Sequence, residues 1–196
     1  GNFVVDGGTV KLDGNYPTGT DNVALGDTAL DSVEAGGINN VAIGDHAGTA
    51  ITTGDSNIAI GKDALTTNQT ADFNIAIGKD ALKVNTADSN TAIGLCAMQA
   101  NTSGGVNVAV GYEALEQNTT AGENTGVGYR ALKGNTTGCQ NASFGTCSVY
   151  TNSTGDANTG VGYKALFANT TADGNTAFGF CSLTTNTTGT ENTAVG

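Results

Sequence analysis

The sequence contains a five-residue motif that returns at an almost constant interval, and this repeat limits the possible folds more than any other feature. At residues 107–111 the motif is Asn-Val-Ala-Val-Gly, and every copy begins with Asn and reaches Gly four positions later. The interval from one leading Asn to the next is 18, 17, 17 and 16, and then 17 six times in succession. The leading residues are Asn22, Asn40, Asn57, Asn74, Asn90, Asn107, Asn124, Asn141, Asn158, Asn175 and Asn192. A period this constant predicts a solenoid in which each repeat forms one coil.

Composition excludes several classes of function. Thirty glycines, no tryptophan and 13% charged residues are not typical of an enzyme core, so we expect no catalytic activity and no cofactor. The 38% of apolar residues fall in a strict register, which argues against disorder. A net charge of −11 argues against nucleic acid or an anionic membrane surface as a partner. No apolar run is long enough to predict membrane insertion.

The period divides the chain into two unequal parts. Residues 1–21 lie outside the repeat, and we expect them to cap the open end of the first coil. Val10 and Leu12 alternate with polar residues and predict a short strand there. Residues 22–196 form the predicted β-solenoid domain. The chain begins without Met and stops within a repeat, so we expect it to be a segment of a longer protein.

Two columns of large apolar residues recur when positions are counted from the leading Asn as zero. Their β-branched bias favours strands over helices, and a repeat this short with glycine-rich bends cannot hold two packed helices. We therefore predict an all-β fold, a parallel β-solenoid of about eleven coils, with both columns filling the coil core. Position three holds Leu25, Ile43, Ile60, Ile77, Ile93, Val110, Val127, Phe144, Val161, Phe178 and Val195. Position eight holds Leu30, Leu65, Leu82, Met98, Leu115, Leu132, Val149, Leu166 and Leu183, with Gly48 as the exception.

Position two never holds a residue larger than Ser. In a strand it points away from position three, and a solvent-facing column would tolerate larger polar residues. We interpret the column as inter-chain packing in a homo-oligomer wound about a common axis, because a single thin coil buries little apolar surface. The alternative is a tight contact within the chain. The column is Ala24, Ala42, Ala59, Ala76, Ala92, Ala109, Gly126, Ser143, Gly160, Ala177 and Ala194.

The second half of each repeat is a polar bend such as Asn-Thr-Thr-Gly at residues 135–138. Asn and Gly tolerate left-handed backbone conformations, and Asn, Ser and Thr bond to nearby main chain. Stacked identical bends would also let Asn amides bond to one another along the axis. At a spacing of about 4.8 Å per coil, the rod would be roughly 50 Å long.

Position five carries an aromatic column that allows two interpretations. Exposed rings could bind sugar rings, or they could simply stack on one another beside a turn. The column is Tyr112, Tyr129, Tyr163 and Phe180. At position six, Glu113 and Arg130 fall in adjacent coils, which predicts an ion pair between coils.

The cysteines and the single histidine do not predict a catalytic or metal site. Cys96, Cys147 and Cys181 share position six but lie two or three coils apart, too far for disulfides within one chain. A bridge between Cys139 and Cys147, or between chains, stays open. No metal-ligand spacing occurs, and His46 has no recognisable nucleophile motif near it.

The period also generates most of the Asn-x-Ser/Thr sequences, so these are weak evidence for glycosylation. They begin at Asn68, Asn101, Asn118, Asn135, Asn141, Asn152, Asn169 and Asn186.

The repeat resembles those of two groups of fibrous proteins. Residues 124–138 and 158–172 read Asn-Thr-Gly-Val-Gly-Tyr-x-Ala-Leu-x-x-Asn-Thr-Thr-x, with Gly or Ala at the last position, which resembles repeats in bacteriophage tail-fibre and other virion appendage proteins. Residues 4–17 resemble leaders of the same phage proteins. The Asn-x-Ala-Ile-Gly core is similar to the head repeat of trimeric autotransporter adhesins. That resemblance implies a left-handed parallel β-roll wound as a homotrimer, and both resemblances imply contact with a host.

These observations predict a non-enzymatic shaft segment of a viral tail fibre, located in the virion and supporting host attachment. Its expected partners are further copies of itself, other fibre or virion proteins and a host-surface glycan. The alternative is the head of a bacterial trimeric surface adhesin. A third hypothesis, an ice-binding solenoid, depends on a partial column of threonines at position one, which other residues interrupt. These are Thr91, Thr125, Thr159, Thr176 and Thr193.

Overall fold

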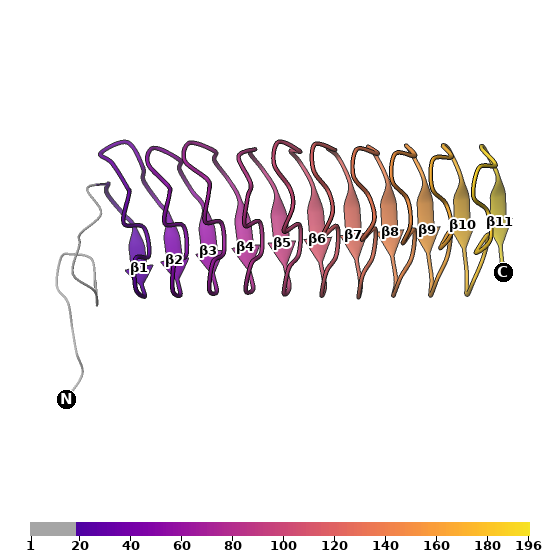
Figure 1. The fold of residues 1–196 in the computed structure, drawn as a ribbon, viewed down its shortest axis with the longest axis horizontal. Coiled ribbons are helices and arrows are strands. Elements are labelled where there is room, and N and C mark those ends of the chain that lie inside the picture. Colours follow the sequence, from indigo (N-terminus) through magenta and orange to yellow (C-terminus); the bar gives the residue numbers. More distant parts are fainter. Residues whose placement is uncertain (1–18) are drawn as a thin grey trace, which may run out of the picture.

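The computed structural model describes residues 19–196, which form eleven short parallel strands and no helix. The strands are β1 (Val23–Leu25), β2 (Val41–Ile43), β3 (Ile58–Ile60), β4 (Ile75–Ile77), β5 (Thr91–Ile93), β6 (Val108–Val110), β7 (Thr125–Val127), β8 (Ala142–Phe144), β9 (Thr159–Val161), β10 (Thr176–Phe178) and β11 (Thr193–Val195). They form one sheet in sequence order, and each strand pairs with the next in parallel and in register (Figure 1). The predicted parallel β-solenoid is confirmed.

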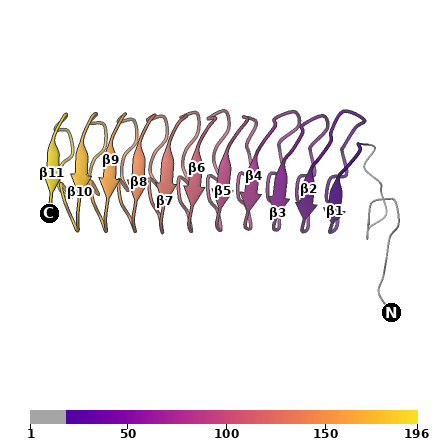
Figure 2. The same ribbon diagram turned by 180° about the vertical axis from the view of Figure 1, so that it is seen from behind.

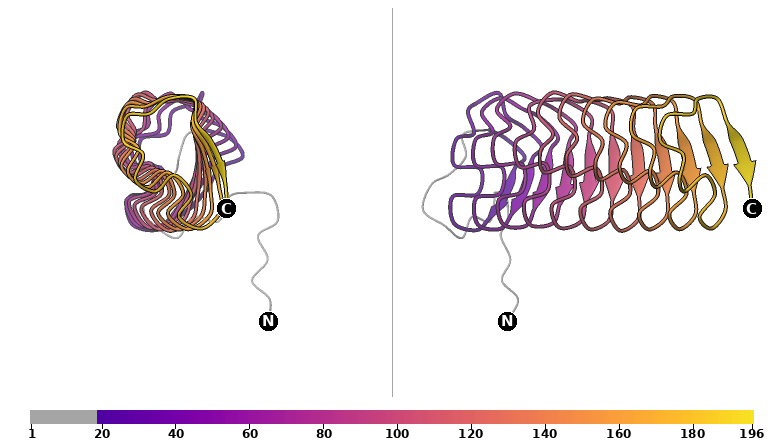
Figure 3. Two further views of the ribbon diagram at one scale, coloured as in Figure 1. Left: turned by 90° about the vertical axis from the view of Figure 1, so that its right-hand side faces the viewer. Right: turned by 45° about the vertical axis from the view of Figure 1, so that its right-hand side comes forward.

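The coils stack into a straight rod. Seen along its axis, successive coils superpose, with the strands on one side of the cross-section and the turns closing the other (Figure 3). The same stack is visible from behind in Figure 2. At about 4.8 Å per strand the eleven strands extend over about 50 Å. The strand expected near Val10 and most of the expected cap lie outside the described residues.

The glycine at position four ends every strand, and from Gly26 to Gly179 both its conformation and its surroundings exclude a side chain. Gly111 has a φ of 139°, which L-residues rarely adopt. A Cβ atom there would also lie 2.4 Å from the carbonyl oxygen of Gly128 in the next coil. The turn therefore requires glycine for two independent reasons.

Position two faces the inside of the coil, so the interpretation of this column as inter-chain packing is wrong. From Ala24 to Ala177 its side chains are buried within the single chain, the alanines with 0% exposure. The alternative of a tight contact within the chain is the one observed. Only Ala194, in the last coil, is half-buried.

A single column of large side chains explains why position two must be small. A Cβ atom on Gly126 would lie 3.4 Å from Cγ of Leu115, and one on Gly160 would lie 2.6 Å from Cγ2 of Val149. Leu115 and Val149 both belong to position eight of the preceding coil. Because the coil is thin, these side chains fill the space opposite the strand.

Position three faces outward, so the prediction that it fills the core is also wrong. Its side chains are half-buried in most coils, and the exposed fraction reaches 37% at Ile93, 43% at Phe144 and 57% at Phe178. The leading Asn and position two lie on the inner face of the strand because side chains alternate, and positions one and three share the outer face. The predicted core residues affected are Ile43, Ile60, Ile77, Ile93, Val110, Val127, Phe144, Val161 and Phe178.

Position eight is confirmed as core. Leu65, Leu82, Leu115, Leu132 and Leu166 have 0% exposure, and Leu183 packs against this cluster from the last full coil. The exception is also explained, since Ile51 is buried in the coil that contains Gly48. A Cβ atom on Gly48 would lie 3.0 Å from Cδ1 of Ile51, which occupies the space that leucine fills elsewhere.

Two ladders of asparagine run through the interior, which confirms the predicted bonding between Asn side chains along the axis. In the first ladder, the side-chain oxygen of each leading Asn accepts a hydrogen bond from the main-chain N–H of the next. Asn124 N, for example, lies 2.9 Å from Asn107 Oδ1. In the second ladder, at position eleven, Nδ2 of Asn118 donates to Asn101 Oδ1 at 2.7 Å, and Asn135 donates to Asn118 at 2.9 Å.

In six coils the two ladders meet at one carbonyl group. The oxygen of Ala121 accepts hydrogen bonds from Asn107 Nδ2 at 2.9 Å and from Asn118 Nδ2 at 3.0 Å. Asparagine can do this because its amide supplies both donor and acceptor. Seven of the eight Asn-x-Ser/Thr asparagines are buried, so the folded coil leaves their amide nitrogens inaccessible to glycosylation.

Each coil also places residues other than glycine in the left-handed backbone region. These occupy the position before the leading Asn, position six and position eight, with φ values of 60° at Val106, 52° at Glu113 and 51° at Leu115. Val106 is the most strained of the three because β-branched residues are genuine outliers there. The side chain of Val106 is 63% exposed, so burial offsets little of this strain.

Candidate functional site

The turn side of the rod carries chemically varied side chains at positions five, six and nine, and their character changes along the axis. In the coils from Asn40 to Asn74, these positions are mainly charged. Lys62 bonds to Asp45, and Nδ1 of His46 lies 3.3 Å from Asp45 and 3.4 Å from Asp63. The Lys62–Asp45 contact is an exposed ion pair, which stabilises a protein only weakly.

The position-five aromatic column is exposed, and its rings stack in two separate pairs. The ring centroids of Tyr112 and Tyr129 lie 5.3 Å apart, as do those of Tyr163 and Phe180. Thr146 interrupts the column between Tyr129 and Tyr163. Stacking beside the turn is therefore confirmed, whereas sugar binding by this column stays a prediction.

A second aromatic pair was missed by the sequence reasoning. Tyr150 and Phe167 occupy position nine of adjacent coils, and their rings lie 5.1 Å apart with an interplanar angle of 4°. Their separation by one full repeat was the signal that could have found them. It was overlooked because the earlier residues at this position are polar or charged, as at Thr66 and Lys83.

Two cations at position six contact the aromatic columns, Arg130 at position five and Lys164 at positions five and nine. Cζ of Arg130 lies 4.9 Å from the centroid of Tyr129, and Nζ of Lys164 lies 5.3 Å from that of Tyr163 and 5.2 Å from that of Phe167. A cation within about 6 Å of a ring centroid is attracted to it. Positions five, six and nine therefore form an aromatic and cationic surface in two parts, one around Arg130 and one around Lys164, with Thr146 between them at position five.

Glu113 is the centre of charge in this surface. Nε of Arg130 lies 2.7 Å and Nζ of Lys133 lies 2.5 Å from its carboxylate, confirming the predicted ion pair between Glu113 and Arg130. Desolvation alone would raise the pKa of Glu113, but hydrogen bonds from Lys133, Tyr112 and Arg130 hold that pKa at about 2. Lys133 also pairs with Glu116 at 3.0 Å. Two negative and two positive groups cancel, so the cluster is electrically neutral.

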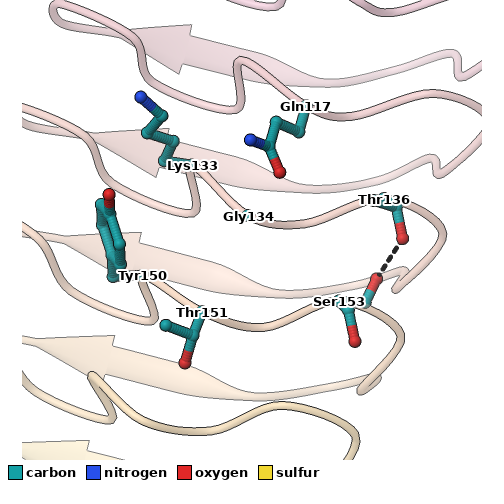
Figure 4. A pocket seen from close by; sticks show the side chains of 7 residues that line it. All are labelled: Gln117, Lys133, Gly134, Thr136, Tyr150, Thr151 and Ser153. Atoms are coloured by element: carbon teal, nitrogen blue, oxygen red, sulfur yellow. Dashed lines mark hydrogen bonds between the residues drawn. The ribbon is translucent and has the colours of Figure 1, made fainter.

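A hollow of about 370 Å³ opens beside this cluster, on the part of the coil opposite the strand. Its floor is Gly134, where position ten lacks a side chain between Gln117 and Thr151 of the neighbouring coils (Figure 4). Lys133 and Tyr150 lie along one edge. Thr136 and Ser153 lie along the other, where Thr136 Oγ1 donates to the carbonyl oxygen of Ser153 at 2.8 Å.

Within the described residues, the cysteine and histidine side chains form neither a metal site nor a disulfide. No group of three or more His, Cys, Asp or Glu side chains within residues 19–196 could hold a metal ion. Cys139 and Cys147 are free and half-buried, like Cys96 and Cys181, so the bridge considered within the chain is not formed. Over the same residues, no helix is long and apolar enough to cross a membrane.

Comparison of the chain with protein-family models, curated proteins and solved structures finds no match. The class that the fold defines is a parallel β-solenoid repeat protein, and function has to be argued from its surfaces.

Proposed function

We propose that this chain is a non-enzymatic structural segment of a fibrous appendage, the shaft of a phage tail fibre, in which three copies associate through the outer face of the sheet. The resemblance of residues 124–138 and 158–172 to tail-fibre repeats supports the class of protein. The observation that carries the association is a strip of exposed and half-buried apolar side chains, interrupted by threonines, along the outer face of the rod.

The outer face of the sheet consists of positions one and three of all eleven strands. Val23 is 41% exposed at one end and Val195 is 79% exposed at the other, with Ile93 and Phe144 between them. At about 3.3 Å per residue and 4.8 Å per strand, the strip covers about 500 Å². The largest apolar patch on a typical monomer is also about 300–600 Å² and is often functional, which makes this strip a candidate interaction site.

A further copy of the same chain is the partner that fits this strip. No residue at position one or position three of any strand is charged, although the chain carries a net charge of −11. Copies can therefore approach through this face with the least electrostatic repulsion. A second rod with the same coil spacing also matches the strip along its whole length, which a globular partner would not do. Three-fold symmetry follows from the resemblance to adhesin heads.

The length of the shaft would be set by the number of repeats in the sequence. Main-chain hydrogen bonds and asparagine ladders run along the axis, so each further repeat adds one rigid coil of about 4.8 Å. Such a rod would hold a receptor-binding part away from the virion and would contact other fibre proteins at its ends.

The head of a bacterial surface adhesin is the alternative, with the same architecture. Immunogold labelling that located the protein on bacterial outer membranes and not on virions would favour it.

The molar mass in solution tests the association. One chain has a mass of 19.4 kDa, and light scattering should give three times this value. The double substitution Ile77→Lys and Val127→Lys on the sheet face should reduce the mass to that of one chain. The matched control, Tyr112→Lys and Tyr163→Lys on the turn side, should leave it unchanged. A wild-type mass of one or two chains would refute the trimer.

The outward position of the threonines also keeps the ice-binding hypothesis testable. Thr125, Thr159 and Thr176 point outward beside position three. Position three, however, holds Val or Phe and not a second Thr in these strands. We expect no thermal hysteresis from the purified protein.

A further inference from the structure

We propose that the hollow above Gly134 binds one neutral hexose unit of a glycan. The sugar ring would stack on Tyr150 and bond to Gln117 and Lys133. This relocates the glycan site from the position-five column to position nine, and it does not depend on the association of chains.

The shape of the hollow comes from a missing side chain. Position ten is Gln117 in one coil, Gly134 in the next and Thr151 in the third, so the column has a gap at its middle member. A Cβ atom on Gly134 would lie 2.8 Å from the carbonyl oxygen of Tyr150, so the floor of the gap is closed by main chain. A volume of about 370 Å³ is within the range of small-ligand sites.

An aromatic face borders the gap. Figure 4 shows the Tyr150 ring nearly edge-on, with its hydroxyl directed toward the coil of Lys133 and one face turned toward Gly134. Phe167 stacks on Tyr150 and Lys164 lies 5.2 Å from the Phe167 centroid, which limits movement of the pair. A pyranose ring presents a face of C–H groups, and a fixed aromatic face is the complementary surface for it.

Polar groups at the rim remain available for sugar hydroxyls. Among residues 19–196, the side-chain amide of Gln117 has no hydrogen-bond partner, and it is exposed above the gap. Lys133 has three N–H donors and uses two of them, for Glu113 and Glu116. One amide, with both a donor and an acceptor, and one ammonium donor suit vicinal hydroxyl groups.

The electrostatics favour a neutral sugar over an acidic one. The charge of Lys133 is already balanced, because Glu113 and Glu116 cancel Lys133 and Arg130. An added carboxylate would meet no uncompensated cation and would be repelled by the net charge of −11.

Ligand-observed saturation-transfer NMR on the intact protein tests this site. The probes are the methyl glycosides of glucose, galactose, mannose and N-acetylglucosamine, with N-acetylneuraminic acid as the acidic comparison. We expect transfer to at least one neutral glycoside, with a Kd on the order of millimolar for a ligand this small. Tyr150→Ala and Gln117→Ala should each weaken transfer at least about fivefold, whereas Tyr163→Ala, an exposed tyrosine outside the hollow, should not.

Gln117→Ala keeps the test valid if Tyr150→Ala lowers the melting temperature, because Gln117 is exposed and supports no other residue. Transfer to none of the four glycosides would overturn the proposal, as would equal losses in the Tyr163 and Tyr150 variants. Stronger transfer to N-acetylneuraminic acid would overturn the neutral specificity. A monomeric protein that still bound the sugar would refute the trimer and leave this site intact.

Discussion

Positions two and three of each repeat are neighbours in sequence but lie in opposite environments. Ala109 is fully buried inside the coil, whereas Val110 is half-buried on the outer face of the sheet. Position two varies only among Ala, Gly and Ser, and position three varies among Leu, Ile, Val and Phe. The interior therefore limits the volume of the side chain at position two, whereas the outer face requires only that the side chain at position three is apolar.

The same contrast holds for polar residues. The asparagine ladders run through the interior almost unchanged, whereas the outer columns at positions five and nine change from charged to aromatic along the rod. The interior maintains the coil, and the exterior is free to differ from one region to the next. The candidate binding surfaces accordingly lie on the outer columns and not in the asparagine ladders.

The largest expected effect comes from enlarging the interior. Ala109→Leu adds three carbon atoms where there is no free space, and we expect the free energy of unfolding to fall by about 3 kcal/mol. Val110→Leu, at the next position, should change it by less than about 0.5 kcal/mol. Chemical denaturation at one protein concentration measures both. Equal effects would contradict the assignment of inside and outside.

Asn118→Ala should have the next largest effect. It removes the donor to Asn101 and Ala121 and the acceptor for Asn135, leaving buried polar groups without partners. We expect a loss of about 2 kcal/mol. The exposed neighbour Gln117→Ala serves as control and should stay within about 0.5 kcal/mol of wild type. A tolerated Asn118→Ala would show that the ladder contributes little to stability.

Val106→Asn should stabilise the protein. Val106 has a φ of 60°, which Asn adopts more readily than a β-branched residue, and its side chain is exposed. We expect a gain of about 1 kcal/mol, measured as a higher melting temperature. Val108→Asn, in the extended backbone of β6, should give no such gain. A lower melting temperature for Val106→Asn would contradict the argument from strain.

The smallest effect should be the pH dependence of the Glu113 cluster. The pKa of Glu113 is about 2 in the folded protein, below its ordinary value of 4.5. Its stabilising contribution is therefore complete above about pH 4.5 and is lost as the pH falls toward 2. Because Arg130 is partly exposed, the contribution of the Glu113 ion pair to the free energy of unfolding should be less than about 1 kcal/mol. Glu113→Gln should lose less stability than wild type between pH 5 and pH 2, and parallel curves would contradict this assignment.

Much of the fold could be predicted because a constant period leaves few solutions. Eleven copies of Asn-x-small-apolar-Gly define the coil length, the strand position and the glycine turn, and each feature is local. The position-eight column and the pair of Glu113 and Arg130 also followed from the period, because residues one period apart become neighbours.

Side-chain size alone could not predict which face of each strand lies inside the coil. Alternation shows that positions two and three point to opposite sides, but it does not show which side is inside. The usual preference for large apolar side chains in a core predicts position three inside, and this prediction is wrong. In this coil Leu115 and its equivalents already fill the space opposite the strand, so only Ala, Gly or Ser fits at position two.

The sequence by itself determined the solenoid, its period, its glycine turns and its asparagine ladders, because these arise from contacts between equivalent residues of adjacent coils. Only the tertiary structure decided which face of the sheet is exposed and that Gly134 opens a hollow beside Tyr150. Both depend on how side chains pack across one coil, where residues half a repeat apart share a narrow interior. The period shows which residues of adjacent coils are neighbours, but it does not show which residues of the same coil are in contact.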